Sequence, residues 1–255
     1  MRLAVLSDIH GNLAALQAVL ADLEAAGGAD QVWVLGDLVA FGPEPVACLR
    51  AIRALPEEKT RVIQGNTDRY VVTGARPSHQ KPTAENWPQL VAGMIARDRN
   101  FEWTAQQLSG EDAEYLAGLG GDLAVEAPGY GWVVGFHAAP GDDEMVLLPD
   151  TPDDEILDAM LDREGSLAFG GHTHLPMDRE LGSWRMVNPG SVGLPFDGDQ
   201  RAAYALATFE GGRAEVAIRR VAYEVEGVIA RLEEVGHPAA GWVSERLRTA
   251  SPPTG

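Results

Sequence analysis

The chain has 255 residues, of which 45% are hydrophobic and 23% charged, a composition typical of a folded globular protein. Its formal net charge of -18 provides no basic surface for non-specific binding to nucleic acid or to an anionic membrane. The single cysteine, Cys48, excludes an intramolecular disulfide and lies in a helical pattern where we expect it to be buried. With no apolar run of the length of a signal or membrane segment, we expect a cytosolic protein.

The first part of the chain alternates strand and helix patterns. Short apolar runs that end in small or acidic residues indicate buried strands, and apolar residues at helical spacing separate them. Asn12 is a good N-cap for the first helix, and Gly27-Gly28 marks its end. The predicted elements are strands at 2–6, 31–35 and 61–64, and helices at 13–23 and 45–55.

The pattern changes at residue 78. Residues 78–120 carry helix-like stretches and a Ser109-Gly110-Glu111-Asp112 helix start without strand alternation, which predicts a helical insertion. The rest is rich in strands, predicted at 123–126, 131–136, 166–169, 183–187, 203–209 and 214–220, followed by a helix at 225–235. We therefore expect a single domain over 1–250 and a disordered tail at 251–255.

Side chains that can bind metal ions follow the ends of the predicted strands. These residues are Asp8, His10, Asp37, Asn66, His137, His172 and His174. Open α/β sheets place their sites at such strand ends, where loops bring several side chains together. A mixture of imidazole and carboxylate suits Mn, Fe, Zn, Co or Ni better than Mg or Ca. The flexible Gly170-Gly171 pair would let the two histidines of His172-Thr173-His174 face different ions.

The motifs that contain these residues resemble, in order, the signature of the calcineurin-like metallophosphoesterase superfamily. They are Asp8-Ile9-His10, Gly36-Asp37, Gly65-Asn66-Thr67-Asp68, Phe136-His137 and Gly171-His172-Thr173-His174. The segment Asn188-Pro189-Gly190-Ser191 is common in the small bacterial, phosphodiesterase-like branch of that superfamily. The resemblance covers most of the chain. It implies a four-layer αββα sandwich of two mixed β-sheets flanked by helices, with a helical insertion.

The resemblance also implies a dinuclear metal centre. One ion would be held by Asp8, His10 and His174, the other by Asn66, His137 and His172, and Asp37 would bridge them. We expect two divalent ions, manganese first, or else Fe, Zn, Ni or Co. Hydrolysis would use a metal-bound hydroxide and no protein nucleophile, with Asp37, Asn66 and His137 as the metal-linked catalytic residues.

Thr67 departs from the family pattern, because many members have a histidine at this position that assists the leaving group. Threonine cannot serve as an acid near neutral pH. Asp68, which would partner that histidine, is expected to cap a helix instead. Arg69, which follows the Gly-Asn turn, and His79, at the start of the insertion, are candidate substrate contacts.

The remaining aromatic and histidine residues have plainer interpretations. We expect His237 to be a surface residue beyond a helix, and Trp87, Met94 and Trp103 to pack inside the insertion rather than stack on a base. The predicted function is hydrolysis of a phosphodiester or phosphomonoester, with a small phosphate ester or a nucleotide as substrate. The alternatives are a non-catalytic scaffold of the same fold and a phosphatase of dinucleoside polyphosphates or phosphoproteins.

Overall fold

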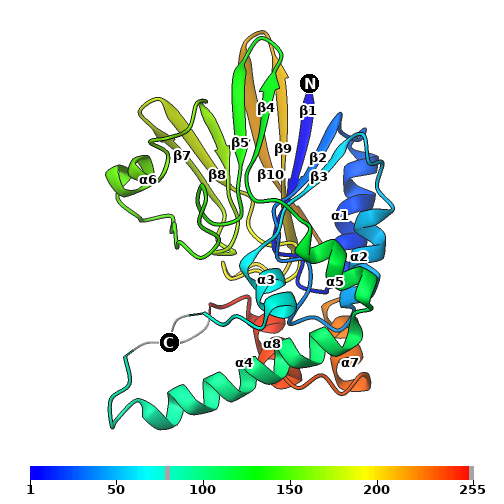
Figure 1. Cartoon of the computed structure of the whole chain (residues 1–255). Coiled ribbons are helices and arrows are strands. Elements are labelled where there is room, and N and C mark those ends of the chain that lie inside the picture. Colours follow the sequence, from blue (N-terminus) through cyan, green and yellow to red (C-terminus); the bar gives the residue numbers. More distant parts are fainter. Residues whose placement is uncertain (78–80, 253–255) are drawn as a thin grey trace.

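The computed structural model describes residues 1–77 and 81–252, whose strands form two five-stranded sheets (Figure 1). The first sheet has the order β10-β9-β1-β2-β3, with β1 (Arg2–Leu6), β2 (Gln31–Val34), β3 (Thr60–Val62), β9 (Ala202–Glu210) and β10 (Arg213–Val221). The second has the order β4-β5-β6-β8-β7, with β4 (Leu123–Ala127), β5 (Gly131–Gly135), β6 (Leu167–Phe169), β7 (Met177–Leu181) and β8 (Trp184–Asn188).

Each sheet is joined by two parallel and two antiparallel strand pairings. In the first sheet β1, β2 and β3 run parallel, while β9 and β10 are antiparallel to their neighbours. In the second sheet β5, β6 and β8 run parallel, while β4 and β7 are antiparallel. The carboxyl ends of the parallel strands in one sheet share an edge, so the loops that follow these strands lie close together.

The side chains of each strand divide between two hydrophobic layers. Leu3 and Val5 of β1 face the layer between the sheets, where they join Phe169 of the second sheet. Ala4 and Leu6 face the opposite way, into the cluster beneath the helices. This alternation is the period of two that a strand buried on both faces requires.

Helices cover the outer faces of the two sheets. The helices α1 (Leu13–Ala25) and α2 (Pro45–Arg53) lie against the first sheet, and α6 (Asp153–Ala159) packs on the second. The order of layers is therefore helix, sheet, sheet, helix, and the predicted αββα sandwich is confirmed. The N-cap of α1 is also confirmed, because the Asn12 side chain accepts a hydrogen bond from the N–H of Ala15.

The segment between β3 and β4 is helical. It contains α3 (Asn66–Thr73), α4 (Trp87–Gln107) and α5 (Gly110–Ala117), and the long α4 extends along the base of the molecule in Figure 1. The helices α7 (Val225–Glu234) and α8 (Ala240–Thr249) pack on each other near it. No helix among residues 1–77 and 81–252 is both long enough and apolar enough to cross a membrane.

Two expectations for single residues were wrong. His237 is buried, with 4% of its surface exposed, and its ring packs edge-to-face on Trp103 of α4 with the centroids 4.4 Å apart. Trp87 at the start of α4 is 52% exposed, because this end of the helix extends beyond the sheets and finds little to pack against. His79 and most of the predicted tail, residues 253–255, lie outside the described residues.

Candidate metal centre

The structure brings all seven candidate ligands to the shared edge of the two sheets. Asp8 and His10 follow β1, Asp37 follows β2, Asn66 begins α3 after β3, His137 follows β5, and His172 and His174 follow β6. Six of them are buried, and His172 is partly exposed. Elements far apart in sequence thus contribute side chains to one polar cluster, which is surrounded by buried apolar residues.

One group of ligand atoms comes from Asp8, His10, Asp37 and His174. One ligand atom from each residue lies within 4.8 Å of the others. The Nε2 atoms of His10 and His174 are 3.1 Å apart. His174 Nε2 is 3.4 Å from an Asp8 oxygen, and His10 Nε2 is 3.5 Å from Asp37 Oδ2. Two imidazole nitrogens and two carboxylates that converge in this way make a suitable set of ligands for a transition-metal ion.

A second group forms around the side-chain oxygen of Asn66. Asn66 Oδ1 lies 2.9 Å from His137 Nε2 and 3.2 Å from His172 Nδ1. His137 Nε2 is also 3.5 Å from Asp37 Oδ1. Asp37 therefore faces one group with Oδ2 and the other with Oδ1, which is the arrangement expected of a carboxylate that bridges two cations.

Backbone carbonyls orient three of the four histidines. The Nδ1 atoms lie near carbonyl oxygens in the pairs His10 with Val39 at 3.4 Å, His137 with Leu35 at 2.7 Å, and His174 with Leu194 at 2.5 Å. When Nδ1–H donates to a carbonyl, the lone pair is on Nε2, which is the atom that each ring presents to its group. These hydrogen bonds therefore assign the Nδ1–H tautomer to all three rings.

Most ligands sit on backbone in the left-handed region. Positive φ angles occur at Asp8 (57°), His10 (50°), Asp37 (54°), His172 (67°) and His174 (58°). Residues other than glycine adopt this region at a cost of about 1–3 kcal/mol each, and such strain is concentrated at functional sites. The surrounding sandwich must therefore hold these loops in place.

Two glycines permit the close approach of the ligand loops. A Cβ at Gly65 would lie 2.2 Å from Asp37 Oδ1, and a Cβ at Gly171 would lie 1.9 Å from Ser7 Oγ. Neither contact is possible for a real Cβ atom. Gly65 and Gly171 therefore let neighbouring loops pack closely, in addition to any flexibility they give the chain.

Burial and neighbouring charges shift the pKa values of the candidate ligands. Burial, followed by the negative charge of Asp8, raises the pKa of Asp37 above its usual value. Burial, followed by the charge of His174, lowers the pKa of His10 to about 3. Burial opposes ionisation of Asp8 as well, but His174 beside it holds the pKa of Asp8 below its usual value. A metal ion binds imidazole in its neutral form and carboxylate in its ionised form. A buried carboxylate is stabilised in that form by the positive charge of the ion.

Residues outside the ligand set fix the loops. Asp68 caps α3 by accepting the Gly65 N–H, and its other oxygen accepts the N–H groups of Leu38 and Val39 directly after Asp37. It therefore joins the Asp37 loop to the start of α3, which agrees with the capping role expected from the sequence.

The Asn188–Ser191 segment supports the other ligand loops. Asn188 Nδ2 donates to the carbonyl of Gly171 at 2.7 Å, and Ser191 Oγ donates to the carbonyl of Asp8 at 2.7 Å. The sequence marked this segment only through a family resemblance and gave it no role. Because its partners are backbone atoms more than 15 residues away, no local pattern could have shown the role.

Arg69 forms ion pairs with two carboxylates. Its guanidinium donates to Asp143 at 2.6 and 2.8 Å and to Glu144 at 2.6 Å, and this ties α3 to the loop that follows His137. A contact between Arg69 and substrate remains a prediction, and it would require these carboxylates to share the guanidinium.

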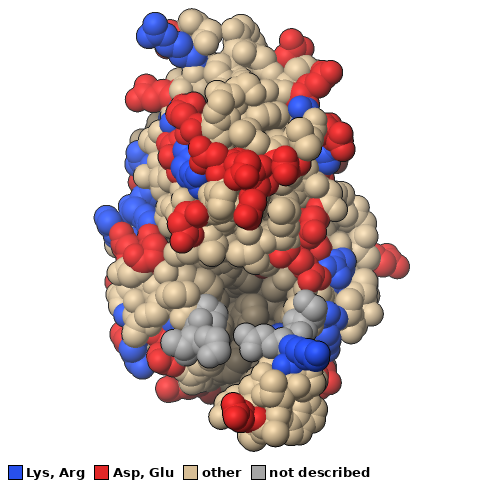
Figure 2. All heavy atoms as spheres, turned by 90° about the vertical axis from the view of Figure 1, so that its left-hand side faces the viewer, with Lys and Arg blue, Asp and Glu red and all other residues tan. Residues whose placement is uncertain are grey.

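The surface carries an excess of acidic side chains. Figure 2 shows them gathered over the upper part of the face that carries α6 and β7, with a hollow beneath them. An anionic substrate is repelled by such a face, because the formal net charge is -18. Positive charge at the ligand groups would therefore be needed to hold a phosphate.

The sandwich carries, at a sheet edge, a buried cluster of Asp and His residues that could hold a metal ion. The chain belongs to the calcineurin-like phosphoesterase superfamily, whose domain model matches residues 1–212. It is 32% identical to an uncharacterised protein of Methanocaldococcus jannaschii over 96% of both chains. It is also 36% identical to a symmetrical bis(5'-nucleosyl)-tetraphosphatase of Cronobacter sakazakii, over 40% of this chain and 36% of that protein.

Two solved structures match nearly the whole chain. A metallophosphoesterase from Sphaerobacter thermophilus superimposes with a TM-score of 0.73 at 28% identity, covering 98% of this chain and 100% of that one. A hypothetical protein from Pyrococcus horikoshii OT3 superimposes with a TM-score of 0.82 at 24% identity, covering 99% of both chains. The second likeness concerns the fold alone.

Proposed function

We propose that this protein is a hydrolase of phosphoric esters that works with two divalent cations, and that phosphodiesters are slightly favoured over phosphomonoesters. The observation that carries the proposal is the position of Asp37. Its two oxygens face two separate groups of nitrogen and oxygen ligands, each 3.5 Å from a histidine Nε2. A carboxylate so placed offsets the repulsion between two cations a few ångströms apart.

The residues present fit such a pair of ions. Asp8, His10 and His174 would hold one ion and Asn66, His137 and His172 the other, with Asp37 between them. The mixture of imidazole, carboxylate and amide oxygen suits manganese first, and Fe, Zn, Ni or Co as well. When bound, the two cations would activate a water molecule and offset the charge of the phosphoryl oxygens.

The protein's own contribution is orientation. Carbonyl oxygens fix the rings of His10, His137 and His174, and Asp68 fixes the loop that carries Asp37. Thr67 supplies no acid near neutral pH. Esters with good leaving groups should therefore be hydrolysed more readily than alkyl esters, and this favours activated diesters.

A dinucleoside polyphosphate is the second candidate substrate. The partial match to symmetrical bis(5'-nucleosyl)-tetraphosphatases supports it, but that match covers 40% of this chain. A scaffold without catalytic activity is less consistent with the site, because such a protein has no need for all seven ligand positions, five of them on strained backbone.

Elemental analysis and metal titration of the purified protein test the proposal. We expect close to two transition-metal ions per chain at saturation, and hydrolysis of a bis-nitrophenyl phosphodiester that disappears on chelation and returns on adding metal. A metal-free protein that binds none of Mn, Zn, Fe, Co and Ni would refute the ligand assignment. A protein that is fully loaded but hydrolyses no ester would instead favour the scaffold.

A further inference from the structure

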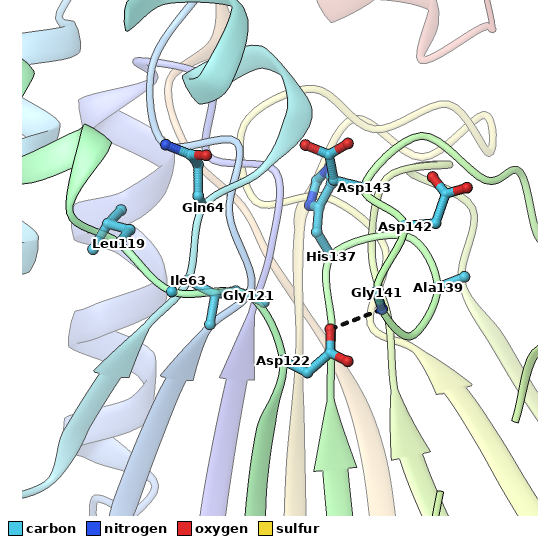
Figure 3. Close-up of a pocket in the computed structure, with 11 residues that line it drawn as sticks. Ile63, Gln64, Leu119, Gly121, Asp122, His137, Ala139, Gly141, Asp142 and Asp143 are labelled. Carbon is cyan, nitrogen blue, oxygen red and sulfur yellow. Dashed lines mark hydrogen bonds between the residues drawn. The ribbon is translucent and has the colours of Figure 1, made fainter. Parts of the chain in front are cut away.

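A cavity of about 390 Å³ lies beside the second ligand group (Figure 3). This volume falls within the range of small-molecule sites. The lining residues that matter are Gln64, Gly121, Asp122, His137, Asp142 and Asp143. Figure 3 shows Gln64 on one side of the cavity and His137 with Asp143 on the other, while Asp122 is hydrogen-bonded to the N–H of Gly141.

The cavity adjoins the candidate metal centre through one shared residue. His137, whose Nε2 faces Asn66, also lines the cavity. Gln64 precedes Asn66 by two residues, and the loop with Asp142 and Asp143 follows His137 directly. A phosphate at the ligand groups would therefore place one of its ester substituents in this cavity.

The cavity wall offers hydrogen-bond acceptors. Gln64 uses its Nε2 to donate to the Leu116 carbonyl at 2.7 Å, so its amide oxygen remains as the acceptor. Asp142 Oδ1 accepts the backbone N–H groups of Glu144 and Met145, and no arginine among the described residues forms an ion pair with Asp142. The exposed Asp142 carboxylate therefore lines the cavity without an arginine partner.

The other two carboxylates of the wall are paired with arginines. Asp122 is paired with Arg163, and Asp143 shares Arg69 with Glu144. The carboxylates around the cavity therefore outnumber the arginines that pair with them. Hydroxyl and amine groups would be stabilised there, and a second phosphate would be repelled.

We propose that this cavity binds a substrate substituent rich in hydrogen-bond donors, either a polyhydroxylated or an amine-bearing group, and rejects substituents that carry a further phosphate. This inference rests on the proposed phosphoesterase function. It counts against dinucleoside polyphosphates, whose neighbouring phosphates would have to enter a negatively charged cavity.

Gly121 offers a steric test of the cavity. A Cβ at Gly121 would meet no atom within 4 Å, and its backbone is not in the left-handed region. Gly121→Leu should therefore fill space in the cavity without displacing the fold. Gly110→Leu is the matched control, because a Cβ at Gly110 also meets open space and this residue begins α5 outside the cavity.

Asp142→Asn is a second, nearly isosteric variant that tests charge. The asparagine oxygen can still accept the N–H groups of Glu144 and Met145, so the loop should keep its shape. Thermal melting and metal content, measured for each variant, report whether fold and ligand groups are intact.

The substrates are 4-nitrophenyl phosphodiesters that differ only in the second ester group. Methyl, 2,3-dihydroxypropyl, 2-aminoethyl and 2-phosphoethyl esters share one leaving group, so differences in kcat/KM report on how the second group is bound. The dihydroxypropyl and aminoethyl esters separate a neutral polyol from a cationic amine. The phosphoethyl ester tests whether the cavity rejects a substituent that carries a second phosphate.

We expect the better donor-bearing ester to exceed the methyl ester about tenfold in kcat/KM, mainly through KM, and the phosphoethyl ester to fall below the methyl ester. Gly121→Leu should remove the preference and leave the methyl ester unchanged. Asp142→Asn should weaken the preference, most strongly for the amine, and relieve the exclusion of phosphate. Gly110→Leu should behave as the original protein.

Equal rates for all four esters in the original protein would overturn the inference while leaving the phosphoesterase function intact. A loss of methyl-ester hydrolysis as large as that of the preferred ester in a folded, metal-loaded Gly121→Leu would also overturn it. If no ester is hydrolysed, the proposed function fails, and calorimetric binding of glycerol phosphate against methyl phosphate to the metal-loaded protein decides the inference. Equal affinities would then reject it, whereas tighter glycerol phosphate binding that Gly121→Leu abolishes would support it.

Discussion

Asp37 is the residue that we propose as the bridge between the two ligand groups. Its side chain is 2% exposed, its backbone is left-handed, and the Thr67 N–H donates to its Oδ1 at 2.9 Å. His10 contacts only the first of the two groups. The two residues therefore allow the bridge to be tested against an ordinary ligand.

Asp37→Ala should reduce metal content from about two ions per chain to near none and abolish hydrolysis, because it removes a ligand from both groups. His10→Ala should retain close to one ion, since Asn66, His137 and His172 remain. Asp37→Asn keeps an acceptor for the Thr67 N–H, so it controls for a change in the conformation of the Asp37 loop. Elemental analysis is the measurement, and small equal losses in the two alanine variants would show that the bridge is misassigned.

Thr67 stands where many members of the family have a histidine, and it is 6% exposed beside Asp37. If Thr67→His places an imidazole over the ester, general acid catalysis should accelerate alkyl esters on the order of 10²-fold and nitrophenyl esters little. The measurement is kcat/KM across a leaving-group series at matched metal loading, with Thr67→Gln as the control without an acid. An original protein that already hydrolyses alkyl monoesters as fast as activated diesters would contradict this reasoning.

The helices and strands that were predicted are those whose own residues carry a clear pattern. The parallel strands β1, β2 and β6 are continuous apolar runs, and α1 has both its N-cap and its terminal glycines in the sequence. The candidate ligands follow from the same strand ends.

The elements α6, β7 and α8 were not predicted, and each depends on distant partners. The short α6 buries Ile156 and few other side chains, β7 is an edge strand whose middle residues are polar, and α8 buries Arg246 and Ser244 beside its apolar residues. The left-handed ligand backbone could not be predicted either, because it is imposed by contacts such as that of Gly65 with Asp37.

Two aspartates at the N3 position of a helix allow an element-scale prediction. Asp68 caps α3 and also accepts two N–H groups of the Asp37 loop in a fully buried position, whereas Asp112 caps α5 with Ser109 near the surface. Asp68→Ala should lower the free energy of unfolding by about 3 kcal/mol or more and weaken metal binding, because it leaves buried N–H groups unpaired.

Asp112→Ala is the matched comparison. It should cost about 1 kcal/mol, the usual value of an N-cap interaction, and leave metal content unchanged. Urea denaturation of the metal-loaded variants measures both free energies. Similar losses in the two variants would show that Asp68 only caps its helix and does not support the Asp37 loop.

The whole molecule combines an acidic surface with a centre that needs positive charge. We expect the same excess of carboxylates to disfavour non-specific binding to nucleic acid and to stabilise cations at the ligand groups. Away from that centre, the packing of the helices also depends on ionisation, through one buried histidine that joins α4 to the connection between α7 and α8.

His237 accepts the Ala239 N–H at Nδ1, so its proton is on Nε2, which is buried without a hydrogen-bond partner among the described residues. Burial lowers the pKa of His237 to about 4, below the value near 6.5 expected in the unfolded chain. The unfolded state therefore binds the proton more readily between these two values. The stability that the neutral, buried ring contributes is complete above pH 6.5 and is lost as pH falls toward 4.

The original protein should thus lose roughly 2 kcal/mol between pH 7.5 and pH 5 relative to His237→Gln, whose side chain does not titrate. Urea denaturation of both proteins at the two pH values, with metal loading matched, gives this difference directly. The comparison cancels the titration of the ligand histidines, because both proteins contain them. The difference in unfolding free energy between the two proteins could instead be the same at both pH values. The ring would then take up a proton in the folded state without penalty, and the packing of α4 would not depend on a neutral His237.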